Sequence, residues 1–450
     1  MAKSATRNLT VGSPMKLIVS FTVPLLFGFV FQQFYNIADT AIVGRFLGAG
    51  ALAAVGSTGS LNFLILGFCN GLCAGFAIPI AQAFGANDRD NVRRYVWNTV
   101  YLCAVISIIL GIVTGLMSRT LLQWMNTPPD ILYSANSYIQ LIFLGIPATV
   151  MYNMAGGIMR SLGDSKTPVL FLIMASLINI VLDLVFILVL KLGVMGAALA
   201  TVISQLVAGA ACVVTIIKRL PLLHGGDRRF DRRICSKLMG IGLPMGLQYS
   251  ITAIGSVILQ VAVNGLGTMY VAAVAAAAKI FNLFCCVFDA LATTLATYAG
   301  QNIGAKKVDR IGQGLKAATI IGIAYCVVCV VTIGLFGRQL TTIFLSAGEI
   351  YVIEKAYRYM FIQAWFYIPL LFVNILRLTI QGMGYTKVAI VAGVLEMIAR
   401  TAVAFLLVPA LGFDAACFAS PCAWLAADAF LFPCYFSVIK KMKKRLKVAA

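Results

Sequence analysis

The stretch AQAFGAND, residues 81–88, returns as GQNIGAKK at residues 300–307, and this recurrence decides the fold. Two further pairs repeat in the same order: SLGDSKT (161–167) with GMGYTKV (382–388), and LGVMGAALA (192–200) with LGFDAACFA (411–419). The three spacings are 219, 221 and 219 residues, close to half of a 450-residue chain. The sequence therefore indicates two similar halves.

The composition places both halves in a membrane. Hydrophobic residues make up 61% of the chain and charged residues only 11%, against roughly 25% charged residues in a soluble domain. One soluble core cannot bury that much apolar surface, so the class is a polytopic membrane protein. The first apolar stretch, which runs to Gly44, is too long for the core of a signal peptide, so we interpret it as a retained membrane helix.

Polar breaks divide the chain into twelve apolar segments, each long enough to cross roughly 30 Å of hydrocarbon as a helix. Their expected spans are 15–44, 51–80, 94–117, 131–160, 168–190, 193–217, 238–264, 270–298, 313–336, 350–380, 387–410 and 414–437. Because six is even, the two halves share one orientation. We therefore predict an all-α fold of two parallel six-helix bundles with pseudo-two-fold symmetry.

The distribution of Lys and Arg predicts the orientation. If the N-terminus is cytoplasmic, 27 of the 35 basic residues fall on the inner side and 6 on the outer side. Both termini are therefore expected on the cytoplasmic side of the cell membrane. The expected domains are an N-lobe (1–217), a basic cytoplasmic linker (218–237) and a C-lobe with a basic tail (238–450). The tail is interpreted as an anchor at the anionic leaflet, and no nucleic acid partner is expected.

Several kinds of chemistry are disfavoured. The single histidine, His224, lies in the polar linker, which argues against zinc sites and histidine-based catalysis. No G-x-x-x-x-G-K-[ST] motif occurs, so no P-loop ATPase is built in. The CVVC at 326–329 lies in an apolar helix, where cysteines serve as small hydrophobic residues. We expect no enzyme and no cofactor; a pump of this sequence would use an ion gradient or a partner.

Five acids lie within expected helices, and intramembrane acids are by default candidates for functional sites. They are Asp39, Asp183, Asp289, Glu396 and Asp428. Counted from the outer helix ends, Asp39 lies about 9 Å deep, and Asp183 and Thr201 about 12 Å deep. Asn179 shares the helix face of Asp183. These four side chains are expected at one level of the N-lobe.

Two uses of such a site are open. Two nearby carboxylates cannot both stay ionised cheaply, so the pair can hold a proton; alternatively, the oxygen atoms can coordinate Na⁺. In either case occupancy neutralises the site and can be coupled to a conformational change, for which a bend of the first helix at Pro24 is a candidate. A third interpretation is that Asp39 and Asp183 only fix helix packing.

The second half carries a different set of charges. Glu396 and Arg400 are spaced i,i+4 and are expected to form an ion pair. Lys279 could pair with Asp289 or with Glu396, and structural and functional roles are equally open. Asp428 has no obvious partner in the sequence.

At several points the sequence resembles the multidrug and toxic compound extrusion (MATE) family, over nearly its full length. The matching stretches are PLLFGFVFQQFYNIADTAIVGRFLGAGALAAVG (24–56), AQAFGA and GQNIGA, RSLGDSKTP (160–168), and LINIVLDLVF (177–186) followed by LGVMGAALATVISQ (192–205). The resemblance implies a monomeric exporter of organic, often cationic, compounds, driven by inward H⁺ or Na⁺.

The resemblance also implies site residues. In one branch of the family the N-lobe cation site matches Asp39, Asn179, Asp183 and Thr201, the four residues that depth counting selects. Substrate-cavity candidates on this basis are Gln32, Tyr35, Asn36 and Asn153. Another branch places acids on the seventh and tenth helices of the C-lobe; here 238–264 has none, and the tenth helix has none after Glu354.

Two other functions compete. Relatives of this fold flip lipid-linked oligosaccharides, but such cavities carry several basic residues, and only Lys279 and Arg400 are expected inside helices here. A membrane enzyme or scaffold is disfavoured by the duplication and by the lack of a catalytic constellation.

Overall fold

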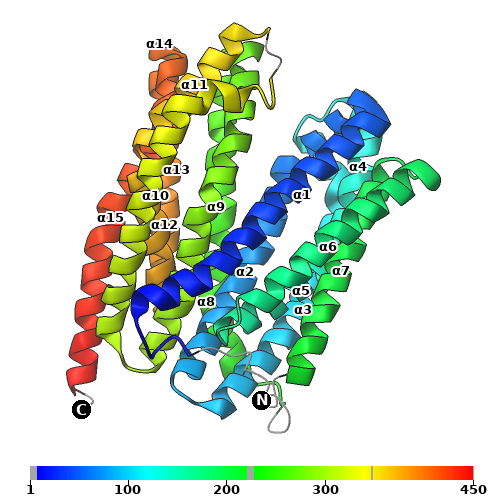
Figure 1. Cartoon of the computed structure of the whole chain (residues 1–450). Helices are drawn as coiled ribbons and strands as arrows, with labels where there is room; N and C mark the ends of the chain where they lie inside the picture. The colour runs from blue at the N-terminus through cyan, green and yellow to red at the C-terminus, as the bar shows by residue number, and fades with distance from the viewer. Residues whose placement is uncertain (1–7, 220–227, 346–347, 449–450) are drawn as a thin grey trace. The chain divides into compact units, whose positions relative to one another are not determined.

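A computed structural model describes residues 8–219, 228–345 and 348–448, and its regular elements there are all helices (Figure 1). His224 lies outside these residues. The helices of the first half are α1 (Pro14–Ser57), α2 (Gly59–Gly85), α3 (Arg89–Trp124), α4 (Pro129–Leu144), α5 (Ile146–Ser161), α6 (Lys166–Leu184), the π-helix η1 (Val185–Val189) and α7 (Val194–Arg219).

The second half repeats this order. Its helices are α8 (Arg232–Asn264), α9 (Thr268–Gly304), α10 (Val308–Thr341), α11 (Ile350–Trp365), α12 (Tyr367–Gly382), α13 (Thr386–Ala402), the π-helix η3 (Val403–Leu407), α14 (Val408–Leu411) and α15 (Phe413–Val448).

Twelve membrane spans are confirmed when each bent helix pair counts as one. Ten spans in the described chain are long and apolar enough to cross a membrane, and two bent pairs bring the number to 12. These pairs are α4 with α5, bent by 44°, and α11 with α12, bent by 56°. Pro147 and Pro369 follow the two breaks by two or three residues, where a missing backbone N–H favours a kink.

The irregular positions repeat along the chain as the sequence motifs do. Left-handed backbone occurs at Gly163 (φ 91°) and Gly384 (φ 94°), and again at Gly193 (φ 61°) and Gly412 (φ 63°). Glycine adopts this conformation without the steric cost of a Cβ atom. The two π-helices also fall at matching places, η1 after α6 and η3 after α13. The repeat thus extends to local backbone geometry.

The described helices pack into two compact units. The first contains Val23–Gly246, and the second contains Leu9–Thr22 together with Leu247 and all that follows. Two helices therefore change unit along their length: α1 near Pro24, and α8 near Pro244. The division into lobes at the linker 218–237 stays a prediction.

The beginning of the described chain is anchored in the second unit by the repeat motif GQNIGAKK. The backbone N–H of Leu9 donates to Gln301 Oε1 at 2.8 Å. Lys307 Nζ donates to the carbonyl of Thr10 at 3.0 Å, and Arg310 Nη2 donates to the carbonyl of Gly12 at 2.8 Å.

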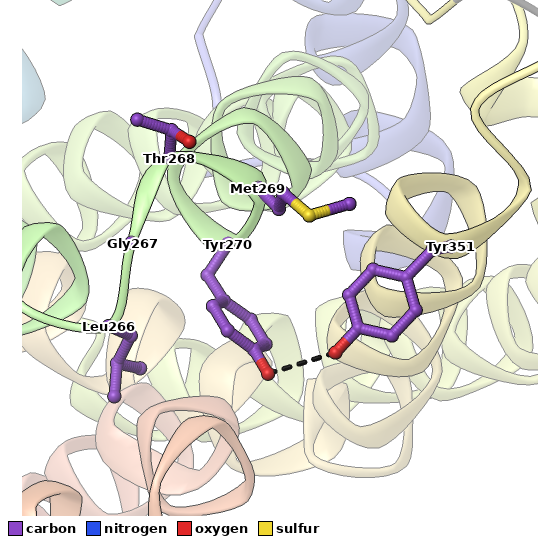
Figure 2. A pocket seen from close by; sticks show the side chains of 6 residues that line it. All are labelled: Leu266, Gly267, Thr268, Met269, Tyr270 and Tyr351. Atoms are coloured by element: carbon purple, nitrogen blue, oxygen red, sulfur yellow. Dashed lines mark hydrogen bonds between the residues drawn. The ribbon is translucent and has the colours of Figure 1, made fainter.

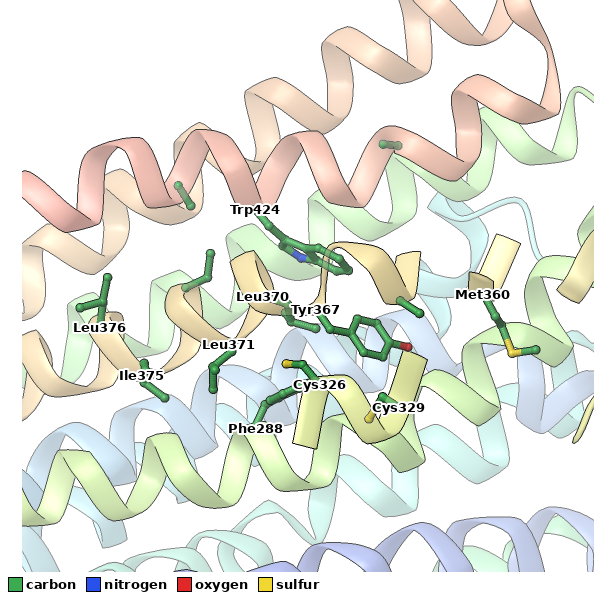
Figure 3. Packing of buried hydrophobic residues seen from close by; sticks show 14 of the residues in the cluster. Phe288, Cys326, Cys329, Met360, Tyr367, Leu370, Leu371, Ile375, Leu376 and Trp424 are labelled. Atoms are coloured by element: carbon green, nitrogen blue, oxygen red, sulfur yellow. The ribbon is translucent and has the colours of Figure 1, made fainter. Parts of the chain in front are cut away.

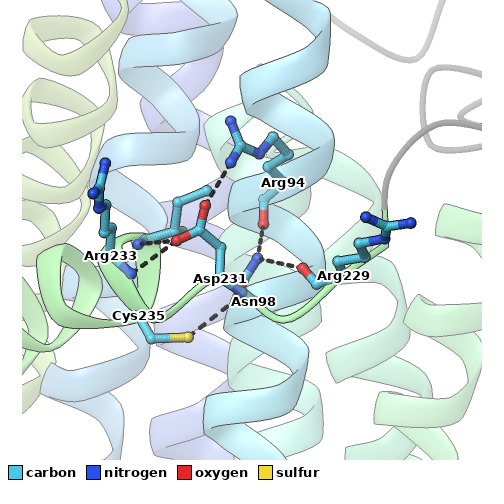
Figure 4. A network of polar contacts seen from close by, with 7 residues as sticks. Arg94, Asn98, Arg229, Asp231, Arg233 and Cys235 are labelled. Carbon is cyan, nitrogen blue, oxygen red and sulfur yellow. Dashed lines mark hydrogen bonds and ion pairs between the residues drawn. The ribbon is translucent and has the colours of Figure 1, made fainter.

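The start of α8 is anchored in the first unit by α3 (Figure 4). Arg94 Nη2 donates to Asp231 Oδ2 at 2.5 Å, and the buried Asn98 accepts from the N–H of Asp231 at 2.9 Å. The backbone N–H groups of Ile234 and Arg233, with Arg94, lower the pKa of Asp231 below its usual value. Asp231 thus caps α8 as a carboxylate.

In lipid, helices associate mainly through van der Waals packing and not through the exclusion of water. Small residues at helix crossings allow the backbones to approach closely, which strengthens this packing. In the first unit α2 and α8 meet so closely that a Cβ on Gly75 would lie 2.5 Å from Gly242 Cα. The second unit packs around aromatic rings. Phe288 meets Tyr367 edge-on at 5.8 Å (Figure 3), and Phe281 stacks on Trp424 at 6.1 Å. Each unit is therefore a packed bundle with its own core.

Candidate ion-coupling site

Three helices of the first unit bring the N-lobe candidates together. The helix α1 carries Tyr35 and Asp39, which are four residues apart and so share a face. The helix α6 carries Asn179 and Asp183 with the same spacing, and α7 carries Thr201. The π-helix η1 begins two residues after Asp183, and such irregular turns often accompany functional sites.

The carboxyl groups of Asp39 and Asp183 lie close enough to interact with each other. Asp183 is fully buried, and Asp39 is half-buried. Two carboxylates at such close range repel each other when both are ionised. A proton or a cation at the pair relieves this repulsion.

Polar neighbours hold the pair in place. One orientation of the Asn179 amide satisfies both its ends: the nitrogen donates to Asp183 Oδ2 at 2.8 Å, and the oxygen accepts from the N–H of Thr201 at 3.1 Å. The hydroxyl of Tyr35 lies 3.1 Å from the hydroxyl of Thr201. The cluster is thus one hydrogen-bonded network across α1, α6 and α7.

Two acceptors of this network are left over. Oδ1 of Asp39 and Oδ1 of Asp183 are both buried and have no hydrogen-bond partner. Unsatisfied buried carboxylate oxygens are costly, and a proton or a hard cation would satisfy them. No group of three or more His, Cys, Asp or Glu side chains suited to a metal occurs in the described part of the chain. The donor set fits H⁺ or Na⁺.

Tyr138 is a member of this site that sequence patterning did not predict. It is buried on α4 and interacts electrostatically with Asp39, Tyr35 and Asp183. Depth counting would have found it, because it lies seven residues, about 10 Å, from the expected outer end of its helix at residue 131.

The other cavity candidates do not join the network. Gln32 and Asn36 are exposed on α1. Asn153 is half-buried on α5, where its amide nitrogen donates to the carbonyl of Thr149 at 2.9 Å. The structure leaves all three outside the Asp39–Asp183 cluster.

The charges of the second unit differ from the expected arrangement. Glu396 forms an ion pair with Arg377 of α12, so the expected pair with Arg400 is wrong. Arg377 lies in the expected span 350–380 but was counted among the basic residues on the inner side; α12 extends to Gly382 and buries it. Arg400 instead approaches α8, where a Cβ on Gly255 would lie 3.1 Å from its Nη1.

Lys279 and Asp289 are both exposed on α9 and lie ten residues apart. No ion pair joins Lys279 to Asp289 or Glu396 among the described residues; its ammonium lies 5.4 Å from the ring centre of Phe344. Asp428, which the sequence left without a partner, is buried and interacts electrostatically with Arg377. Two arginines and two acids thus balance inside the second unit.

The helical fold, with up to 12 candidate membrane spans in the described chain, defines a polytopic membrane protein. The sequence model of the MatE family matches residues 24–185 and, a second time, residues 244–406. The chain belongs to this family, the multidrug and toxic compound extrusion family, and the double match confirms the repeat.

Named relatives agree with this family. The probable multidrug resistance protein YoeA of Bacillus subtilis (strain 168) is 28% identical over 373 residues, 81% of this chain and 80% of that protein. The FAD transporter of Shewanella oneidensis is 22% identical over 341 residues, 74% of this chain and 75% of that protein. A crystal structure of MATE in complex with MaL6 superposes with a TM-score of 0.91 at 24% identity, covering 99% of this chain and 100% of that chain.

Proposed function

We propose that this protein is a secondary antiporter that exports organic, often cationic, compounds in exchange for H⁺ or Na⁺. The observation that carries the proposal is that Asp39 and Asp183, which interact with each other, each have a buried carboxyl oxygen without a hydrogen-bond partner. An ion that enters this network neutralises it, and its departure restores the repulsion between two carboxylates.

Coupling then follows from differential binding. An ion drives a conformational change only if it binds one shape of the protein more tightly than the other. Asp39 lies on α1, and this helix changes unit near Pro24, so the charge state of the pair acts on a helix that belongs to both units. We propose that α1 bends there as access alternates from one side to the other.

The setting of the antiporter is part of the proposal. The excess of basic residues on one side supports cytoplasmic termini in the cell membrane. We propose a monomer whose substrates are small organic molecules and whose other partner is the bilayer. Because one relative is named an FAD transporter, an anionic dinucleotide belongs among the substrates to be assayed.

The test is efflux of ethidium or norfloxacin, measured in everted vesicles under an imposed pH gradient or an imposed Na⁺ gradient. Asp39→Asn keeps the shape of the side chain but removes its charge, so we expect coupled efflux to be lost. Asp130→Asn is the matched control, because Asp130 is an exposed acid of the same unit in the first turn of α4; its efflux should be normal.

Two results would overturn the proposal. Normal coupled efflux by Asp39→Asn would remove the acid pair from the mechanism. Efflux that continues in the wild type after both gradients are collapsed would exclude secondary coupling.

A lipid-linked oligosaccharide flippase is not favoured. The two buried arginines of the second unit, Arg377 and Arg400, lie in a region that also contains Glu396 and Asp428. This balanced set leaves no net positive charge for a pyrophosphate group.

A further inference from the structure

Three aromatic rings surround an ammonium group in the second unit, at the end where α8 connects to α9. Lys355 Nζ lies 5.2 Å from the ring centre of Tyr351, 5.7 Å from that of Tyr270 and 5.9 Å from that of Phe413. The hydroxyls of Tyr270 and Tyr351 hydrogen-bond at 2.9 Å (Figure 2), and Tyr270 packs on Phe413 at 4.9 Å. We call Tyr270, Tyr351 and Phe413 the aromatic cage.

The nearby acids do not explain why Lys355 lies in the cage. Glu354 binds Arg338 through two hydrogen bonds of 2.8 and 3.0 Å, and Asp414 binds Arg358 at 2.9 Å. No carboxylate lies within ion-pair distance of Lys355 among the described residues. The ring faces are thus the partners of its charge, and each lies within the roughly 6 Å over which a ring attracts a cation.

A pocket of 490 Å³ adjoins the cage (Figure 2). Its lining consists of Leu266, Gly267, Thr268, Met269, Tyr270 and Tyr351. Two of the three cage rings therefore face both the ammonium and the pocket. Leu266 and Met269 add apolar and polarisable surface, which accommodates substituents of varied shape.

We propose that the aromatic cage and this pocket form a binding site for organic cations, and that Lys355 is its tethered occupant. Rings arranged around a cation are the structure by which proteins recognise quaternary ammonium groups. A ligand would place its ammonium where Lys355 Nζ now lies and its apolar groups against Leu266 and Met269. Lys355 competes by proximity and by charge repulsion, so it keeps the affinity of the wild type low.

This site is separate from the acid pair. The cage is formed by α9, α11 and α15 in the second unit, and Asp39 and Asp183 lie in the first. The inference goes beyond the proposed antiport, because it concerns equilibrium binding in the absence of any gradient.

The test measures binding of radiolabelled tetraethylammonium to the purified full chain in detergent by equilibrium dialysis. Lys355→Ala vacates the cage, and we expect it to bind at least fivefold more tightly than the wild type. Adding Tyr351→Ala to that variant removes one ring, which should weaken binding by roughly two- to fivefold. If Lys355→Ala does not fold, Lys355→Gln removes the charge while keeping most of the chain length.

The matched control is Lys237→Ala. Lys237 Nζ lies over a single ring, 5.0 Å from the centre of Tyr95, in the first unit. Its removal changes the net charge equally but opens no cage, so affinity should stay at the wild-type level. Equal affinities of wild type, Lys355→Ala and Lys355→Gln would overturn the proposal, and so would an equal gain in Lys237→Ala.

A failure of the cage proposal can be distinguished from a failure of the antiport proposal, because the first is measured by binding and the second by efflux. The double variant Lys355→Ala/Asp39→Asn should bind tetraethylammonium as Lys355→Ala does, even though its coupled efflux is lost. A loss of the gained binding in this double variant would place the ligand at the acid pair and not in the cage.

Discussion

Thr201 contacts α1 through its hydroxyl and α6 through its backbone N–H. This hydroxyl meets the hydroxyl of Tyr35 at 3.1 Å, and the N–H of the same residue donates to Asn179. Asn179 in turn donates to Asp183. A change at Thr201 therefore reaches both α1 and α6 without altering either carboxylate.

Thr201→Val removes this hydroxyl at nearly constant volume. Tyr35 then loses its partner, at a cost of about 1 kcal/mol, and we expect the concentration of coupling ion for half-maximal efflux to rise roughly fivefold. Thr201→Ser keeps the hydroxyl and should stay near the wild type. The measurement is efflux titrated against H⁺ and against Na⁺. Equal shifts in both variants would show that the hydroxyl does not position the site.

Much of this site could be predicted from the sequence, and the limits are physical. Depth counting placed Asp39, Asp183 and Thr201 at one level because helix rise is constant. Tyr138 lies at a similar depth, but an uncharged side chain in a helix is not by itself a sign of a functional site. Arg377, three residues before the expected end of its helix, was counted with the basic residues on the inner side, because hydropathy does not locate a helix end to within a turn.

At the scale of helices, the crossing of α2 and α8 depends on two glycines. A Cβ on Gly75 would meet the backbone of Gly242 at 2.5 Å, and backbone cannot move aside as a side chain can. Gly240 lies two residues earlier on the same helix as Gly242, and a Cβ there would meet nothing within 4 Å.

These two environments give opposite expectations for alanine. Gly75→Ala should destabilise the protein by about 1–3 kcal/mol through overpacking. Gly240→Ala, the matched control, should be neutral or stabilising by up to about 1 kcal/mol, because alanine favours helix. Thermal unfolding in detergent measures both. A midpoint for Gly75→Ala at or above that of Gly240→Ala would contradict the close crossing.

The cap of α8 predicts a pH dependence. The folded protein holds the pKa of Asp231 below its usual value of 3.8, so folding favours the carboxylate. The stability that it contributes is present above about pH 4 and is lost as the pH falls below that value. Asp231→Asn lacks this contribution at every pH.

The unfolding midpoints of the wild type and Asp231→Asn should therefore differ at pH 6 and converge towards pH 3. Asp130→Asn serves again as the control, and its difference from the wild type should show no such convergence. A constant difference between wild type and Asp231→Asn from pH 6 to pH 3 would show that the carboxylate does not act as the cap.

Element boundaries were less predictable than element existence. The first two helices were expected at 15–44 and 51–80. Non-helical backbone at Gly48 (φ 86°) interrupts α1, and the membrane spans are Pro14–Gly48 and Gly50–Gly85, so each helix end differs by a few residues. The π-helices η1 and η3 also left no sign in the hydropathy pattern, because an extra residue in one turn does not change the mean apolar content. Hydropathy identifies a span but not its internal irregularities.

At the scale of the whole molecule, each half of the sequence contributes a helix start to the unit formed by the other half. Residues Leu9–Thr22 belong to the second unit, and α8 as far as Gly246 belongs to the first. The spacing of the repeats predicted two bundles, but not this exchange. Its hydrogen bonds join residues as far apart as 298 positions, and no periodicity in one sequence encodes such a pair.

The exchange predicts that a chain divided in the linker stays assembled. We expect fragments 1–223 and 224–450, when co-expressed, to co-purify in detergent through an affinity tag on either one. Replacing Gln301 and Arg310 by alanine removes two of the hydrogen bonds that hold residues 9–12 and should lower the recovery of the untagged fragment. Recovery that is unaffected by these substitutions would show that other interactions dominate.

The hydrogen bond between Leu9 and Gln301 also affects the order of events during synthesis and membrane insertion. A ribosome adds roughly 5–20 residues per second, so the 292 residues between the two partners take roughly 15–60 s to synthesise. During that interval the first helix is inserted without the surface on which its beginning will rest. The segment that begins at Leu9 must therefore stay accessible, or be held by an insertase, until α9 has been synthesised.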